Sequence, residues 1–204
     1  DSIRLIVVSK QASSEKVLAA YQAGARCFGE NKAQEAVTKI DEVNLPDVSW
    51  HFIGHLQTNK IKYLDSRFDL IHSVDSLSLA KKISTYCEGQ SRKQAVLLQV
   101  NISGEEAKFG MTPSELKNQL FNFGQLKGIR IQGLMTIPPQ DPEPENSRKY
   151  FLKLRELRDT CQALKVEGIE LHDLSMGMTS DYKIAVEEGA TLVRVGSAIF
   201  GSRS

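Results

Sequence analysis

The stretch Arg4–Ala25, "RLIVVSKQASSEKVLAAYQAGA", contains the structural unit from which the fold of this chain can be predicted. Its residues 5–8 are apolar and mostly β-branched, and they predict a buried strand over Leu5–Ser9. Ser13 or Ser14 can cap a helix that begins there, and Gly24 can end that helix in a left-handed conformation. The stretch therefore predicts a strand, a short turn and a helix.

The same alternation of a short apolar run and a longer segment of helical period recurs along the whole chain. Eight strand–helix units favour parallel strands joined by right-handed crossovers. The expected strands are Leu5–Ser9, Arg26–Phe28, Trp50–Ile53, Leu70–Ser73, Ala95–Asn101, Ile129–Met135, Glu170–Leu174 and Thr191–Val195. After the first helix, the expected helices are Asn31–Val43, Ser76–Cys87, Pro113–Phe123, Glu145–Leu164 and Asp181–Glu188, with a shorter segment at Gln57–Asp65 and one turn at Ser197–Phe200.

The predicted fold is an α/β fold, a single (β/α)8 TIM barrel over residues 1–204 without a second β domain. The length of 204 residues lies at the lower end of the range for this barrel. A doubly wound open sheet is the alternative that the periodicity leaves open. The stretch Pro138–Ser147, "PPQDPEPENS", resembles a linker, but its place between a strand and a helix predicts a long loop on the barrel.

Composition excludes several classes of function. The net charge of +1 gives no indication of a nucleic acid or of an anionic membrane as a partner. We expect no membrane segment and no signal peptide, because no apolar run approaches the length of a bilayer span. Three scattered cysteines, Cys27, Cys87 and Cys161, form no C-x-x-C pair and fit a reducing cytoplasm.

Polar residues that do not suit a core follow the predicted strands. In a parallel barrel the carboxyl ends of all strands open onto one face, where binding and active sites are built. Gly177 and Gly196 allow the backbone to approach an anion, and Ser197 begins a turn whose N–H groups can face a phosphate. Ser175 and Thr179 add hydroxyl groups. Each glycine by itself is equally consistent with a tight turn, so only the convergence of these segments indicates a phosphate site.

Two cations complete this predicted site. Arg194 lies among apolar residues of the last strand, so it contacts either a ligand or a structural carboxylate. Lys10 follows the first strand, where a lysine is ordinarily solvated. At the mouth of a barrel, partial desolvation lowers the pKa of a lysine amine and makes it available to attack an aldehyde. An amine, a phosphate cradle and a buried arginine on one face together describe a site for pyridoxal 5'-phosphate (PLP).

Several segments between residues 6 and 201 resemble the pyridoxal phosphate homeostasis protein family. They are "VVSK", "FGEN", "WHFIGHLQTNK", "HSVD", "NISGEEAKFG", "GLMTI", "LSMGMTSDY" and "VRVGSAIFG". The resemblance implies a fold-type III PLP-binding barrel like the N-terminal domain of alanine racemase. It also implies a helix before the first strand, which this sequence does not show, and a threonine where Ser197 stands.

The resemblance also implies a role for individual residues. Lys10 would hold PLP as a Schiff base, and Asn31 would lie beside the cofactor. Ser175, Met178 and Thr179 would line the cofactor and help to hold its phosphate. Arg194 would contact the pyridine nitrogen, with Gly196 and Ser197 at the phosphate.

The predicted function is that of a cytoplasmic carrier and regulator in PLP homeostasis, with little or no catalysis and no catalytic residue. Its partners would be PLP and PLP-dependent apoenzymes, as a monomer or weak dimer. A cation beside the ring nitrogen disfavours its protonation and weakens carbanion chemistry. We also expect no second domain to enclose a substrate. The alternatives are a low-activity amino-acid racemase or decarboxylase and, through the basic helix Ser147–Asp159, a protein-interaction module.

The histidines give no indication of a metal site. His51 and His55 have the spacing H-x-x-x-H, but they straddle the end of a predicted strand, where they would lie roughly 13 Å apart if extended. His72 and His172 lie near strand ends, where we expect core or rim histidines that line the same cavity or pack beside it.

Overall fold

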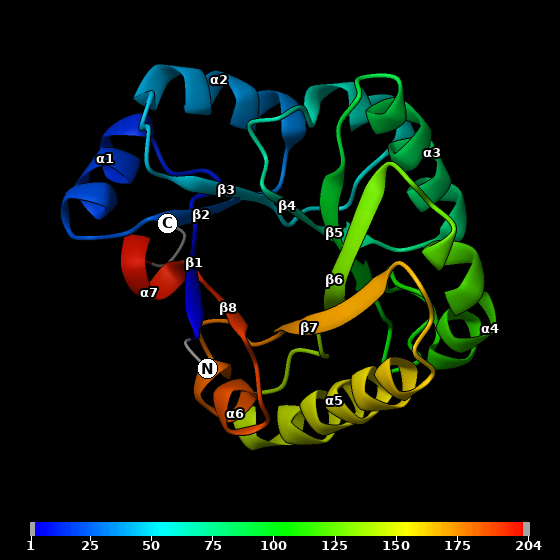
Figure 1. Cartoon of the computed structure of the whole chain (residues 1–204). Coiled ribbons are helices and arrows are strands. Elements are labelled where there is room, and N and C mark those ends of the chain that lie inside the picture. The colour runs from blue at the N-terminus through cyan, green and yellow to red at the C-terminus, as the bar shows by residue number, and fades with distance from the viewer. Residues whose placement is uncertain (1–2, 202–204) are drawn as a thin grey trace.

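The computed structural model describes residues 3–201, which form a closed barrel of eight parallel strands surrounded by helices (Figure 1). The strands are β1 Arg4–Val8, β2 Cys27–Glu30, β3 Ser49–Phe52, β4 Leu70–Val74, β5 Gln94–Gln99, β6 Ile129–Met135, β7 Ile169–Ser175 and β8 Leu192–Val195. The helices are α1 Ser14–Gln22, α2 Ala33–Val43, η1 Thr58–Tyr63, α3 Leu77–Glu88, α4 Pro113–Gly124, η2 Pro144–Ser147, α5 Arg148–Ala163, α6 Tyr182–Glu187 and α7 Ser197–Phe200.

The pairing of the first and last strands closes the barrel. β1 pairs with β8 in parallel, with Ile6 opposite Arg194 and Val7 opposite Val195. This contact excludes the doubly wound open sheet, in which two strands remain as edges. The prediction of a (β/α)8 barrel is confirmed.

The predicted strands and helices are present, with boundaries that differ from the prediction by at most three residues. Ser13 caps α1, because its Oγ accepts a hydrogen bond from Lys16 N, and Gly24 follows the helix with φ +103°. The shorter segment predicted at Gln57–Asp65 forms η1, a 3₁₀ helix. The proline-rich stretch 138–147 lies between β6 and α5 and includes η2, so it is a loop of the barrel.

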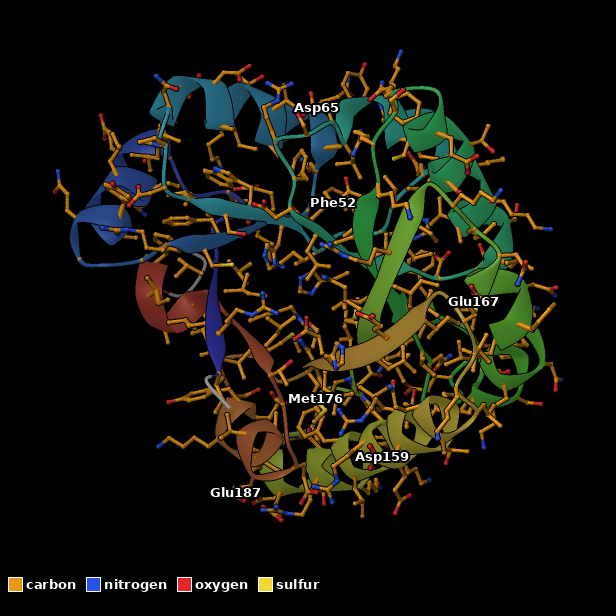
Figure 2. The ribbon with its side chains drawn as sticks, viewed as in Figure 1. Phe52, Asp65, Asp159, Glu167, Met176 and Glu187 are labelled. Atoms are coloured by element: carbon orange, nitrogen blue, oxygen red, sulfur yellow. The ribbon has the colours of Figure 1, made fainter. Side chains whose placement is uncertain are left out.

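Two apolar layers stabilise the barrel. The larger layer lies between the sheet and the helices and buries Phe52 and Met176, while Asp159 and Glu187 lie at the periphery (Figure 2). The smaller layer fills the inside of the barrel with Ile6, Leu70, Ala95, Leu97, Met135 and Leu192. Because this inner layer is small, the barrel also has room for the buried polar side chains described below. Within residues 3–201, no helix has the length and apolar character needed to cross a bilayer.

Candidate functional site

The predicted site residues lie at the carboxyl ends of four strands that are neighbours in the barrel. Because β8 pairs with β1, the order β7–β8–β1–β2 is continuous around the ring (Figure 1). Lys10 lies in the turn after β1, and Asn31 comes directly after β2. Ser175 ends β7, and Gly196 follows β8. Closure of the sheet therefore brings together segments that are almost two hundred residues apart in the chain.

A buried ion pair supports the turn that carries Lys10. Ser9 and Glu30 are buried, and Ser9 Oγ donates to Glu30 Oε1 over 2.6 Å. Lys39, from α2, donates to the same carboxylate oxygen at 2.7 Å and to the Ser9 carbonyl oxygen at 2.8 Å. These bonds fix the backbone immediately before Lys10, whose side chain is half-buried. The structure thus places Lys10 on a rigid support at the mouth of the barrel.

Arg194 is a buried cation inside the barrel, with 4% of its surface exposed. Its Nη1 donates to Ser175 Oγ, and its Nη2 donates to the carbonyl oxygen of Thr136 at 2.9 Å. Within residues 3–201 no carboxylate forms a salt bridge with this guanidinium. Burial lowers the pKa of Arg194 to about 10, and the charge of Asp181 opposes that shift, so the side chain remains a cation at neutral pH. The alternative of a direct ion pair with a core carboxylate is therefore wrong.

The turn after β7 meets the end of β8 through backbone contacts. Arg194 N donates to the Gly177 carbonyl oxygen at 3.0 Å, and Gly196 N donates to Thr179 Oγ1 at 3.4 Å. Met178 N donates to Asp181 Oδ1 at 2.6 Å, which closes the turn. Ser175 is fully buried, Met178 and Thr179 are half-buried, and Ser197 is exposed as the first residue of α7. The residues predicted to hold a phosphate therefore belong to one connected pair of loops.

Glycine is required at position 177 in this turn. Its φ is +89°, and an added Cβ would lie 2.5 Å from Ala185 Cβ and 3.0 Å from Tyr182 Cα. We expect Gly177→Ala to lower the free energy of unfolding by about 2 kcal/mol, from backbone strain and overpacking. Urea denaturation measures this change.

Gly24→Ala is the matched control for this substitution. Gly24 also has a positive φ, +103°, but an added Cβ meets no atom within 4 Å. We therefore expect Gly24→Ala to cost about half as much, since only the backbone term remains. Equal losses in the two variants would show that crowding at position 177 has no effect.

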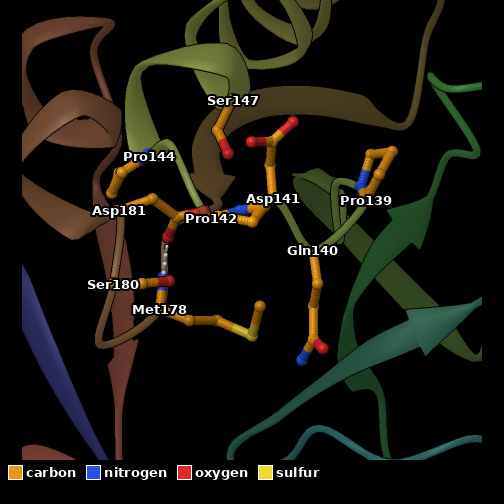
Figure 3. Close-up of a pocket in the computed structure, with 9 residues that line it drawn as sticks. All are labelled: Pro139, Gln140, Asp141, Pro142, Pro144, Ser147, Met178, Ser180 and Asp181. Carbon is orange, nitrogen blue, oxygen red and sulfur yellow. Dashed lines mark hydrogen bonds between the residues drawn. The ribbon is translucent and has the colours of Figure 1, made fainter.

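A cavity of about 340 Å³ lies beside the turn after β7 (Figure 3). The loop after β6 forms one wall through Gln140 and Asp141, and the opposite wall includes Met178 and Asp181. Figure 3 shows the Met178 side chain extending into the space that Gln140 also faces. Met178 thus joins this cavity to the predicted cofactor site.

Sequence reasoning missed several polar groups inside the barrel and between the barrel and α2. It assigned no role to Glu30, Lys39 or Thr136, and it treated His51 and His72 only as core or rim histidines. His51 and His72 are 2% and 0% exposed, and His51 Nδ1 lies 2.9 Å from His72 Nε2. The available signal was a single histidine in each of two apolar strands, "SWHF" and "LIHSV".

The other two histidines lie elsewhere. His55 stacks on Phe109, with ring centroids 3.8 Å apart, and its Nδ1 lies 3.3 Å from Asp75 Oδ2. His172 is exposed beside Glu170, so it does not line a cavity with His72, whereas fully buried His72 agrees with the expectation of a core histidine. In the part of the chain that the structure describes, no group of three or more His, Cys, Asp or Glu side chains is arranged to hold a metal ion.

The fold and the placement of these residues define a class, the barrel domain of alanine racemase-like proteins. The family model described as "Alanine racemase, N-terminal domain" matches residues 3–204. An alanine racemase from Clostridium difficile 630 superimposes with a TM-score of 0.82 over 100% of this chain and 53% of its own, at 14% identity. This second similarity concerns the fold alone.

Within that class, the chain belongs to the pyridoxal phosphate homeostasis protein family. The Aquifex aeolicus member is 44% identical over 201 residues, covering 98% of this chain and 87% of its own. The Vibrio alginolyticus member is 38% identical over 207 residues, covering 100% and 88%. PipY of Synechococcus elongatus PCC7942, solved with PLP bound, superimposes with a TM-score of 0.90 and 38% identity, covering 98% of this chain and 92% of its own.

Proposed function

We propose that this protein binds PLP at the carboxyl end of its barrel, holds it as a Schiff base on Lys10, and serves in intracellular PLP homeostasis as a carrier and regulator. The observation that carries the proposal is that half-buried Lys10, in the turn after β1, and buried Arg194, in β8, belong to neighbouring segments because β1 and β8 pair. Membership of a family in which PipY was solved with PLP bound supports the identity of the ligand.

The chemistry of the described residues fits PLP. Arg194 uses two of its five N–H groups on Ser175 and Thr136, which leaves donors for an acceptor such as a ring nitrogen. The cradle at Gly196 is tight, because an added Cβ would lie 3.2 Å from both the Cβ and the carbonyl oxygen of Val8. Glycine therefore suits this close approach to β1, and we propose that the backbone of this turn lies against the phosphate.

The remaining predicted residues have assigned places in this proposal. When bound, PLP supplies a reactive aldehyde and an electron-withdrawing ring. Lys10 would bind the aldehyde, and Asn31 would lie beside the ring. Ser175 and Met178 would line the cofactor beside its phosphate, and Ser175 would also position Arg194. Thr179, Gly196 and Ser197 would hold the phosphate.

The position of Arg194 favours storage of PLP over catalysis. A guanidinium next to the ring nitrogen disfavours protonation of that nitrogen, so the ring withdraws electrons less strongly. His51 and His72 already use their ring nitrogens in buried hydrogen bonds, which removes them as proton donors to a substrate. We therefore propose little or no racemase or decarboxylase activity and no catalytic residue.

The cellular setting forms part of the same proposal. PLP-dependent apoenzymes would receive the cofactor, and the chain would act as a monomer or weak dimer. Cys27, Cys87 and Cys161 are all free thiols, which supports a reducing compartment such as the cytoplasm.

Trapping of the cofactor tests the proposal. PLP is added to the protein, the mixture is treated with borohydride, and the digest is analysed by mass spectrometry. Hydride addition to the C=N bond converts a Schiff base into a stable secondary amine. We expect one equivalent of label on the peptide that contains Lys10. Label confined to exposed lysines such as Lys32 would refute the assignment.

Turnover measurements separate a carrier from an enzyme. The PLP-loaded protein is incubated with several L-amino acids, and the enantiomer ratio and the release of CO2 are followed. We expect rates no higher than those of free PLP at the same concentration. Rates clearly above that background would support the racemase or decarboxylase alternative.

A further inference from the structure

A continuous chain of hydrogen bonds runs through the barrel from Arg194 to the opposite end. Ser175 Oγ, which accepts from Arg194, lies 2.8 Å from His72 Nδ1. His72 Nε2 lies 2.9 Å from His51 Nδ1, and His51 Nε2 lies 3.1 Å from Ser49 Oγ. Ser49 Oγ then donates to Asp69 Oδ2 at 2.9 Å. Ser49 begins β3 and Asp69 immediately precedes β4, so the chain ends at the amino-terminal side of the barrel.

The exposed end of the chain determines the direction of each hydrogen bond. A carboxylate only accepts, so the single hydroxyl hydrogen of Ser49 goes to Asp69. Ser49 Oγ must then accept from His51 Nε2–H, which makes Nδ1 of a neutral His51 an acceptor. His72 consequently donates through Nε2–H, and its Nδ1 accepts from the Ser175 hydroxyl. One of the two lone pairs of Ser175 Oγ then accepts from Arg194.

The environment of the two rings agrees with this order. Burial, with the charge of Arg4 acting in the same direction, lowers the pKa of His51 to about 4, although the charges of Asp69 and Asp173 oppose the shift. Burial also lowers the pKa of His72 well below its ordinary value, with the charges of His51, Arg194 and Arg4 acting in the same direction. Both rings are therefore neutral at pH 7, and each neutral ring donates once and accepts once.

We propose that His72 and His51 are positioning residues, which through one directed chain of hydrogen bonds from Asp69 hold Ser175 and Arg194 in the orientation that receives the cofactor ring. The Ser175 hydroxyl is turned toward His72, so only its lone pair faces the guanidinium. Arg194 is thereby fixed between Ser175 and the Thr136 carbonyl. This inference rests on the proposed function, because it assumes that Arg194 faces the pyridine nitrogen.

Nuclear magnetic resonance of the cofactor-free protein tests the chain without reference to PLP. Two-bond ¹H–¹⁵N spectra distinguish the two tautomers of neutral histidine, and exposed His172 serves as a reference within the same chain. We expect the Nε2–H tautomer for both His51 and His72, unchanged from about pH 5.5 to 8, a range that spans the ordinary histidine pKa. An Nδ1–H tautomer in either ring would overturn the proposal.

Substitution at the far end of the chain tests whether it positions the site. Asp69→Leu, remote from the proposed cofactor site, removes the oxygen that accepts from Ser49 Oγ and from Trp50 N, and Asp69→Asn retains an oxygen that can accept from both. For Asp69→Leu we expect mixed histidine tautomers and an affinity for PLP about fivefold lower, the effect of one hydrogen bond. We expect Asp69→Asn to restore both properties. Unchanged affinity and tautomers in Asp69→Leu would overturn the proposal.

His72→Phe breaks the chain at its centre, and His172→Phe is its control. We expect His72→Phe to weaken PLP binding about tenfold or more, since two hydrogen bonds are lost, and His172→Phe to leave it unchanged. Should His72→Phe fail to fold, the Asp69 pair decides alone. If trapping shows no label on Lys10 while the tautomers are as expected, the proposed function fails and the hydrogen-bond chain itself remains.

Discussion

Lys10→Ala is expected to abolish the visible absorbance that a Schiff base gives when PLP is added to this protein. The substitution removes the only atom of that side chain able to form the C=N bond, while the Ser9–Glu30–Lys39 hydrogen bonds beneath it remain. We expect the affinity for PLP to fall roughly a hundredfold, about 3 kcal/mol, with the phosphate and ring contacts providing the residual binding. Absorbance titration gives both quantities, and circular dichroism checks the fold.

Lys32→Ala is the matched control for this prediction. Lys32 follows β2 near the same end of the barrel, but it is exposed and pairs with Glu35 at 2.7 Å. We expect Lys32→Ala to retain the absorbance band and the affinity within about twofold, since surface ion pairs contribute little. Loss of the band in Lys32→Ala, with retention in Lys10→Ala, would transfer the covalent site from position 10 to position 32.

The fold could be predicted from local signals because strands and helices alternate with little interruption. Apolar runs of strand length were separated by helices with recognisable ends, such as Ser13 before α1 and Ser76 before α3, which both cap through their hydroxyl oxygens. Eight parallel units can be arranged as a barrel or as an open sheet. The choice depends on contacts between β1 and β8, which lie at opposite ends of the sequence. No pattern of neighbouring residues indicates that these two strands pair.

The candidate site could be predicted in part for the same reason. Once the strands are parallel, every residue that follows a strand lies at one end, so Lys10, Asn31 and Gly196 were expected there together. The interior could not be predicted in this way. His72 and Ser175 are 103 positions apart, and their contact depends on the register between strands and on which side chains face inward. Glu30 and Lys39 likewise meet only because α2 packs over the end of β2.

The two buried imidazoles also predict how stability changes with pH. In the unfolded chain, histidine takes up a proton as the pH falls through its ordinary pKa of about 6.5. Folded His51 does so only near its lowered pKa of about 4. Between these values the unfolded state binds more protons, so the free energy of unfolding must fall as the pH falls. At pH 5 the loss from His51 is roughly 2 kcal/mol relative to pH 7.5, and His72 adds a loss of the same sign.

Urea denaturation between pH 5 and 7.5 measures this slope, and single substitutions identify its source. Arg4 disfavours the protonated form of His51, whereas Asp69 and Asp173 favour it. Carboxyl groups with lowered pKa values, such as Asp65 and Glu115, titrate below this window. His51→Gln lowers stability at every pH but must also flatten the slope, because one imidazole no longer titrates on unfolding, while exposed His172→Gln should leave it unchanged. A slope that stays the same in His51→Gln would mean that His51 takes up its proton at the same pH in the folded and unfolded states, whereas the directed chain from Asp69 to Arg194 requires a neutral imidazole in the folded barrel.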